Sequence, residues 1–137
     1  MFTGTITSEF AAQLELTEVN AWLDLYAAAP ADFARQFQLE IMHVQNVVLT
    51  RCRTIPFIHF NCVMNLGVIA PTSEQQVDEL LTIYREANIR AFAIYHNPHC
   101  RPAQLAEWFK ARNLRIQGGW DRIYRDNAAL ATMVTPP

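Results

Sequence analysis

The strongest constraint on the fold is an abrupt change of pattern within VIAPTSEQQVDELL, residues 68–81. Thr72 and Ser73 each precede a glutamine by three residues, which is the spacing of a capping box at the start of a helix. Apolar residues then recur at intervals of three and four, as on one face of an amphipathic helix: Val77, Leu80, Leu81 and Tyr84. The pattern predicts a helix that begins at this turn and ends near Asn88.

A strand with alternating side chains is predicted just before the turn, from Phe57 to Val68. One face would be apolar and buried: Ile58, Phe60, Cys62, Met64, Leu66 and Val68. The other face would carry His59, Asn61 and Asn65. This polar row would either face solvent or line a groove, in which His59 is a weak candidate for the base of an amine reaction because histidine titrates near neutral pH.

The remaining elements place this strand and helix in an α/β domain. Helices are predicted over residues 9–29, as one helix or as two broken near Thr17, over 31–42 and over 102–112, the last capped by Asn113. Further strands are predicted from Val47, over 89–95 and over 116–125. Alternation of strands and helices indicates a mixed sheet flanked by helices, with the N-terminal helices packed on it. We expect one domain over residues 1–126 and a tail or linker over 127–137.

Composition narrows the classes of function. A formal net charge of -2 over 137 residues gives no general attraction to nucleic acid or to an anionic membrane, and no apolar run is long enough to span a bilayer. The three cysteines are odd in number and lack a C-x-x-C spacing, so neither a disulfide framework nor a metal site is expected. A cytoplasmic location follows by default. The loop HNPHC, residues 96–100, could hold ordinary loop histidines, a ligand or a metal.

Three stretches together resemble the GNAT superfamily of N-acetyltransferases: FNCVMNLGV (60–68), QVDELLTIYREANIRAFAIY (76–95) and QLAEWFKARNLRIQGGWDRIYRD (104–126). Members of that family transfer an acyl group from acyl-CoA to an amine. The resemblance is to the degenerate N-terminal half of tandem two-domain members. It implies a mixed GNAT-like sheet flanked by helices, acetyl-CoA or CoA as cofactor, and a second acetyltransferase domain as partner.

The chain departs from the family pattern at two places. Active members have a glycine-rich turn after the strand, because the pyrophosphate must approach backbone N–H groups closely. Residues 72–79 contain no glycine and no basic residue, but three acids: Glu74, Asp78 and Glu79. In the last helix the resemblance aligns Phe109 with a tyrosine that can protonate the departing thiolate in active members, and phenylalanine has no proton to donate.

These departures favour a non-catalytic or incomplete half that packs on a catalytic acetyltransferase domain and helps shape the acceptor site. One alternative is an active acyl-CoA-dependent N-acetyltransferase for a small amine. It would hold the cofactor through the strand backbone at Leu66, Gly67 and Val68, with Asn61 and Asn65 in the acceptor groove. Another is a stand-alone binding or dimerisation module completed by a second copy of itself. Fold analogy alone does not choose among these functions.

Overall fold

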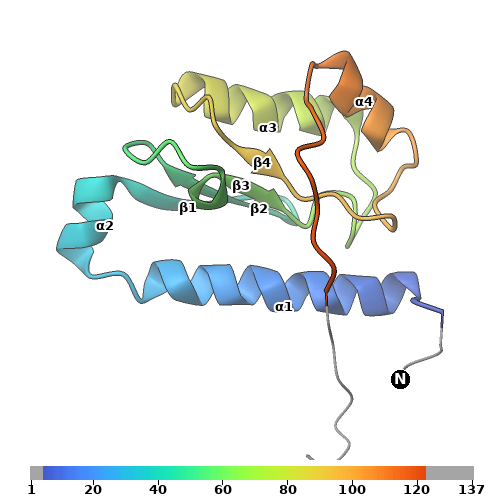
Figure 1. Ribbon diagram of the computed structural model, residues 1–137, viewed down its shortest axis with the longest axis horizontal. Helices are drawn as coiled ribbons and strands as arrows, with labels where there is room; N and C mark the ends of the chain where they lie inside the picture. The colour runs from blue at the N-terminus through green and yellow to red at the C-terminus, as the bar shows by residue number, and fades with distance from the viewer. Residues whose placement is uncertain (1–4, 123–137) are drawn as a thin grey trace, which may run out of the picture.

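The computed structural model describes residues 5–122 and contains a four-stranded sheet between two layers of helices (Figure 1). Helix α1 lies along one face of the sheet, and α3 and α4 lie on the opposite side. After α4 the chain runs back past the sheet to α1. The elements in chain order are α1 (Ser8–Ala27), α2 (Ala31–Phe37), β1 (Leu39–Val44), β2 (Val47–Cys52), the 3-10 helix η1 (Ile58–Phe60), β3 (Cys62–Met64), α3 (Glu74–Glu86), β4 (Ala93–Ile94) and α4 (Leu105–Ala111).

The sheet is mixed, as the sequence predicted. Its strand order is β1-β2-β3-β4, with β1–β2 and β2–β3 antiparallel and β3–β4 parallel. A two-residue turn joins β1 to β2, so Val44 pairs with Val47. The parallel pair brings the carboxyl ends of β3 and β4 to the same edge of the sheet, where sites in α/β proteins commonly lie.

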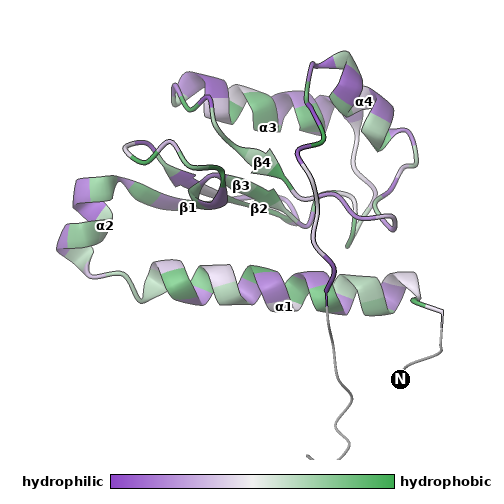
Figure 2. Ribbon diagram, in the orientation of Figure 1, coloured by the Kyte–Doolittle hydropathy of each residue, from purple (hydrophilic) through white to green (hydrophobic). Residues whose placement is uncertain are grey.

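Alternate residues of the strands fill two separate cores. Val47, Leu49 and Val63 point to the side of α3 and α4, in a cluster that also contains Leu80 and Tyr84. The intervening strand residues Val48, Cys62 and Met64 belong to a second cluster on the side of α1. This cluster also contains Val19 of α1 and Tyr95, the residue after β4. Figure 2 shows hydrophobic residues on the strands and on the side of α3 that faces them. Each helical layer is therefore fixed to the sheet by its own buried interface, which is the main favourable term in the stability of such a layer.

Three predicted helices are confirmed, two of them with a predicted capping residue. α1 is one unbroken helix through Thr17, and it is capped by Thr7, whose hydroxyl accepts a hydrogen bond from the Phe10 N–H. α3 begins at Ser73, one of the two predicted caps. Asn113 follows α4 with a φ of 60°, the left-handed conformation expected of a residue that ends a helix.

The predicted helix over 31–42 is wrong in its second half. α2 ends at Phe37, Gln38 adopts a φ of 52°, and β1 then begins at Leu39. Phe33, Phe37 and Ile41 have helical spacing, but residues 39–44 gain a full antiparallel ladder with β2 instead. Pairing with another strand outweighs the local pattern here, because β structure is set largely by neighbouring strands.

The predicted strand from Phe57 to Val68 is also largely wrong, since only Cys62–Met64 is a strand. Residues 58–60 form η1, and a tight turn follows Met64, with positive φ at Asn65 (67°) and Gly67 (75°). The turn breaks the alternation, so Cys62 and Met64 face α1 whereas Leu66 and Val68 join the core under α3. Sequence alternation alone does not reveal this change of side.

The remaining boundaries shift as well. The strand predicted over 89–95 is reduced to Ala93–Ile94, and residues 116–122 form no strand, so the described part of that prediction is wrong. Residues 123–125 and the expected tail over 127–137 lie outside the described residues. Within the part of the chain that the structure describes, no helix has the length and apolar character to cross a membrane.

Candidate functional site

The turn between β3 and α3, where the family resemblance places a pyrophosphate, is closed by the backbone of Arg101. The Arg101 N–H donates to the Gly67 carbonyl at 2.8 Å, and the Thr72 N–H donates to the Arg101 carbonyl at 3.0 Å. The Arg101 guanidinium also donates to the carbonyls of Val68 and Ile69. A Cβ atom placed on Gly67 would lie 2.7 Å from the Arg101 oxygen, so glycine here serves the contact between two chain segments.

A side chain caps one backbone donor at the start of α3. The Ser73 hydroxyl accepts from the Gln76 N–H at 3.1 Å, and the Val77 N–H donates to the Ser73 carbonyl. The Thr72 hydroxyl donates to the Gln76 side-chain oxygen. The Ser73 hydroxyl therefore takes one of the N–H groups that an anion at a helix start would otherwise receive.

Acids at the start of α3 are neutralised from α4. Arg112 donates to both carboxylate oxygens of Asp78, from Nε at 2.5 Å and from a terminal nitrogen at 2.8 Å, and to Glu74 at 3.0 Å. The hydrogen bond from this guanidinium lowers the pKa of Asp78 below its ordinary value. The helix start therefore already holds two carboxylates and their counterion, in the place of a phosphate.

The predicted cofactor residues Leu66, Gly67 and Val68 lie inside this closed turn. All three are buried. The Gly67 and Val68 carbonyls accept hydrogen bonds from Arg101, and the Val68 N–H donates to the Asn65 carbonyl at 3.3 Å. Binding of acetyl-CoA or CoA through this backbone stays a prediction.

The predicted polar row is not assembled on one face. His59 lies exposed in η1, with its ring 4.9 Å from that of Phe57. Asn61 is fully buried before β3, and its side chain accepts from the Cys52 N–H and donates to the carbonyls of Ile55 and Phe57. The Asn61 amide thus joins the end of β2 to the loop that leads into η1, and both of its polar atoms are used. Asn65 follows β3 at its other end.

A buried polar group, the Glu15 cluster, lies at the carboxyl ends of β3 and β4. It consists of Glu15 from α1, Asn65, Asn97 and Arg122. The Glu15 carboxylate is 1% exposed, and it accepts from the Asn65 N–H and the Asn97 side chain, both at 3.4 Å. A terminal nitrogen of Arg122 lies 2.8 Å from Glu15 and also contacts Glu18. The buried Asn65 side-chain oxygen has no hydrogen-bond partner among the described residues.

The ionisation of Arg122 reflects two opposing effects. Burial lowers its pKa, but the hydrogen bond that it donates to Glu18 and the charge of Glu15 raise it more, and the net shift is upward. Arg122 therefore stays cationic beside the buried carboxylate. Sequence reasoning missed this cluster, although Glu15 lies four residues from both Ala11 and Val19 on the buried side of α1. A charge in the middle of an apolar stripe is a signal of a buried ion pair.

The loop after β4 uses its polar residues in local contacts. The His96 ring packs edge-on against Phe109, and burial lowers the pKa of His96. The His99 N–H donates to the Asn97 side chain, and the His99 Nδ1 atom lies 3.4 Å from the Ser8 hydroxyl. Cys100 is buried. No group of three metal-ligating side chains occurs among residues 5–122.

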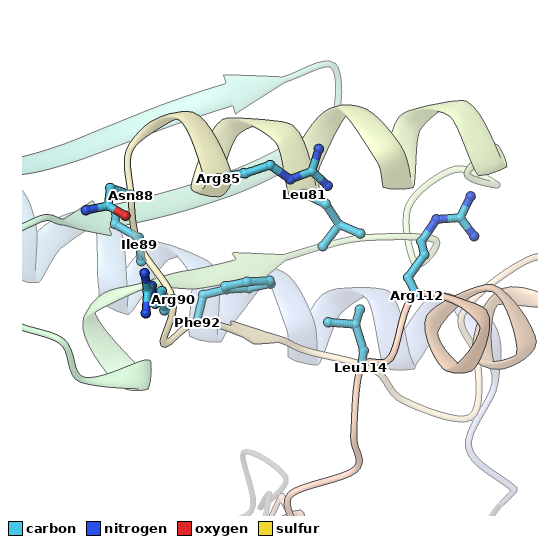
Figure 3. Close-up of a pocket in the computed structure, with 8 residues that line it drawn as sticks. All are labelled: Leu81, Arg85, Asn88, Ile89, Arg90, Phe92, Arg112 and Leu114. Atoms are coloured by element: carbon cyan, nitrogen blue, oxygen red, sulfur yellow. The ribbon is translucent and has the colours of Figure 1, made fainter.

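A cleft of about 430 Å³ opens beside the C-terminal half of α3, away from the closed turn (Figure 3). We call it the arginine cleft. Its walls come from α3, from the segment that leads into β4 and from the chain that follows α4, and its lining residues are Leu81, Arg85, Asn88, Ile89, Arg90, Phe92, Arg112 and Leu114. Sequence reasoning did not single it out.

Comparison with known proteins identifies no relative. No protein-family model, no curated protein and no solved structure matches the chain.

Proposed function

We propose that the chain is an acetyltransferase-like domain of the GNAT kind that does not hold acyl-CoA by itself and serves a partner acetyltransferase domain. Support comes from the order β3, α3, β4, α4 and from the parallel pairing of β3 with β4, because the resemblance rests on that order of strands and helices. Such a domain stabilises its partner and contributes one wall of the acceptor site.

The observation that carries the proposal is the closed turn between β3 and α3. Entry of a pyrophosphate requires loss of the hydrogen bonds that join Arg101 to Gly67 and Thr72, each worth about 1 kcal/mol net. The start of α3 also offers a phosphate no basic residue of its own, since residues 72–79 contain none. The guanidinium of Arg112 is already engaged by the acids Glu74 and Asp78.

The Glu15 cluster supports a role at the acceptor end. It places a buried carboxylate at the carboxyl ends of two parallel strands, which is where ligands of α/β sheets commonly lie. A carboxylate there favours a cation, and the Arg122 guanidinium occupies the position in this chain.

Titration calorimetry with acetyl-CoA and with CoA at low salt tests the loss of cofactor binding. We expect no heat of binding up to about 1 mM ligand, and no thermal shift in a parallel melt. A dissociation constant tighter than about 100 μM would contradict the proposal and favour the active N-acetyltransferase.

Light scattering on the same sample separates the two remaining functions. Among residues 5–122, strand β1 pairs only with β2, and an unpaired edge is the place at which a second copy would add. A partner of a different kind predicts a monomer at all concentrations tested. A concentration-stable dimer would favour the dimerisation module.

A further inference from the structure

The arginine cleft is lined by basic residues and by no acidic residue. Three of its eight lining residues are arginines and none is acidic, whereas the whole chain carries 11 basic and 13 acidic residues. Arg112 is paired with Asp78 and Glu74. Arg85 and Arg90 are exposed and form no ion pair with any residue of the described range 5–122. The cleft is therefore a local positive site on a weakly acidic protein.

The middle of the cleft is apolar. Figure 3 shows Leu81, Phe92 and Leu114 there, with Arg90 beside Phe92, Arg85 above on α3, and Arg112 reaching from the end of α4 toward α3. The Phe92 ring is stacked on Tyr84 with centroids 4.6 Å apart and planes 5° apart. Tyr84 is fully buried and donates to the Thr50 carbonyl, so this stack holds the orientation of Phe92. A flat apolar body has a fixed surface against which to lie.

The end of α3 opposes an anion less than an open helix end would. Its carbonyls at Ile83, Tyr84 and Arg85 accept from the N–H groups of Ala87, Ile89 and Asn88, respectively. These bonds use the carbonyls that carry the negative end of the helix dipole. Beside this helix end, Arg85 and Arg90 supply positive charge to the cleft.

We propose that the arginine cleft binds a small organic carboxylate with a flat apolar body. Either Arg85 or Arg90, which Figure 3 shows at different ends of the cleft, would take the carboxylate, since the planar guanidinium matches its two oxygens, and the apolar residues of the cleft would cover the body. A volume of about 430 Å³ lies within the usual range of small-ligand sites. This site is separate from the closed turn, so it does not depend on binding of acyl-CoA.

The probe for the test is 2-naphthoate, titrated into the full chain at low salt and followed by two-dimensional amide NMR. We expect a dissociation constant of about 0.1 to 1 mM, with shifts concentrated at the lining residues. The neutral analogue 2-naphthalenemethanol should bind at least about tenfold more weakly, because it lacks the charge. Absence of cleft shifts up to about 10 mM naphthoate, or equal binding of the alcohol, would overturn the proposal.

Substitution of Arg85 and Arg90 tests whether these two guanidinium groups bind the carboxylate. Arg85→Gln and Arg90→Gln should each weaken naphthoate binding about threefold, and the double variant about tenfold. Arg115→Gln is the matched control, since Arg115 is exposed, makes no described ion pair and lies outside the cleft. Equal weakening by Arg115→Gln would mean that general charge attracts the probe and would refute the site. Displacement of naphthoate by an equal concentration of inorganic phosphate would likewise refute the role of the apolar residues.

Discussion

The two ends of α3 differ in what surrounds them. At the N-terminal end, where a helix favours an anion, the chain places two acids, closes the adjacent turn with Arg101 and satisfies the cap from Ser73. At the C-terminal half, where a helix disfavours an anion, it places two unpaired arginines beside an open cleft. The comparison teaches that side chains and packing set the charge around each end of α3 in the opposite sense to the helix dipole.

Gly67→Ala should break the closed end and have the largest effect. The new Cβ would meet the Arg101 carbonyl at 2.7 Å on a backbone with a φ of 75°. We expect a loss of about 2 to 4 kcal/mol in the free energy of unfolding, from the strained conformation and the displaced contact. Urea denaturation measures it. Gly119→Ala is the control, because a Cβ there meets no atom within 4 Å, and a similar loss in both variants would contradict the role of the turn.

Removal of the Ser73 cap tests the N-terminal end of α3 a second time. Ser73→Ala deletes the hydroxyl that accepts from the Gln76 N–H, and it should lower the free energy of unfolding by about 1 kcal/mol. Ser73→Gly should cost only about a few tenths of a kcal/mol, because glycine is tolerated at this position. Chemical denaturation of both variants separates loss of the cap from a general disturbance, which would affect the two equally.

Asp78→Asn should move positive charge from the closed end toward the open one. The substitution removes the carboxylate that Arg112 contacts most closely, and Arg112 also lines the arginine cleft. We expect 2-naphthoate to bind about two- to threefold more tightly at low salt, and the gain to disappear at high salt. Unchanged affinity would mean that the electrostatics of the two ends are independent.

The smallest expected effect concerns His96, which packs against Phe109 of α4. Burial lowers the pKa of His96 against Phe109, so around that pKa the unfolded chain binds more protons than the folded one. The stability from neutral His96 is present above the ordinary pKa of 6.5 and is lost as the pH falls through the lowered value. Melting curves between about pH 7.5 and pH 5 should show a smaller decline for His96→Gln than for the wild type. Equal declines would contradict this contribution.

Local patterns predicted the helices better than the strands. α3 was found because its cap and its apolar spacing both lie within residues 72–84. β1 was missed because it depends on pairing with β2. The turn after Met64 was missed because it depends on contact with Arg101, which is distant in the sequence. The predicted site residues illustrate the same limit: Asn61 has the polarity of a groove residue, but its amide is used entirely by a loop. The Glu15 cluster joins four segments of the chain, and only the charge within the apolar stripe of α1 marked it.

The ion pairs of Arg122 have a consequence for how the protein is made. Glu18 and Arg122 are 104 residues apart in the sequence, and Arg122 also supplies the countercharge for the buried Glu15. During synthesis α1 leaves the ribosome early, while its partner arginine follows only after the whole sheet has been made. A buried carboxylate without its cation opposes docking. We therefore expect α1 to settle on the sheet as a late event of cotranslational folding, with its apolar face open to chaperones until then.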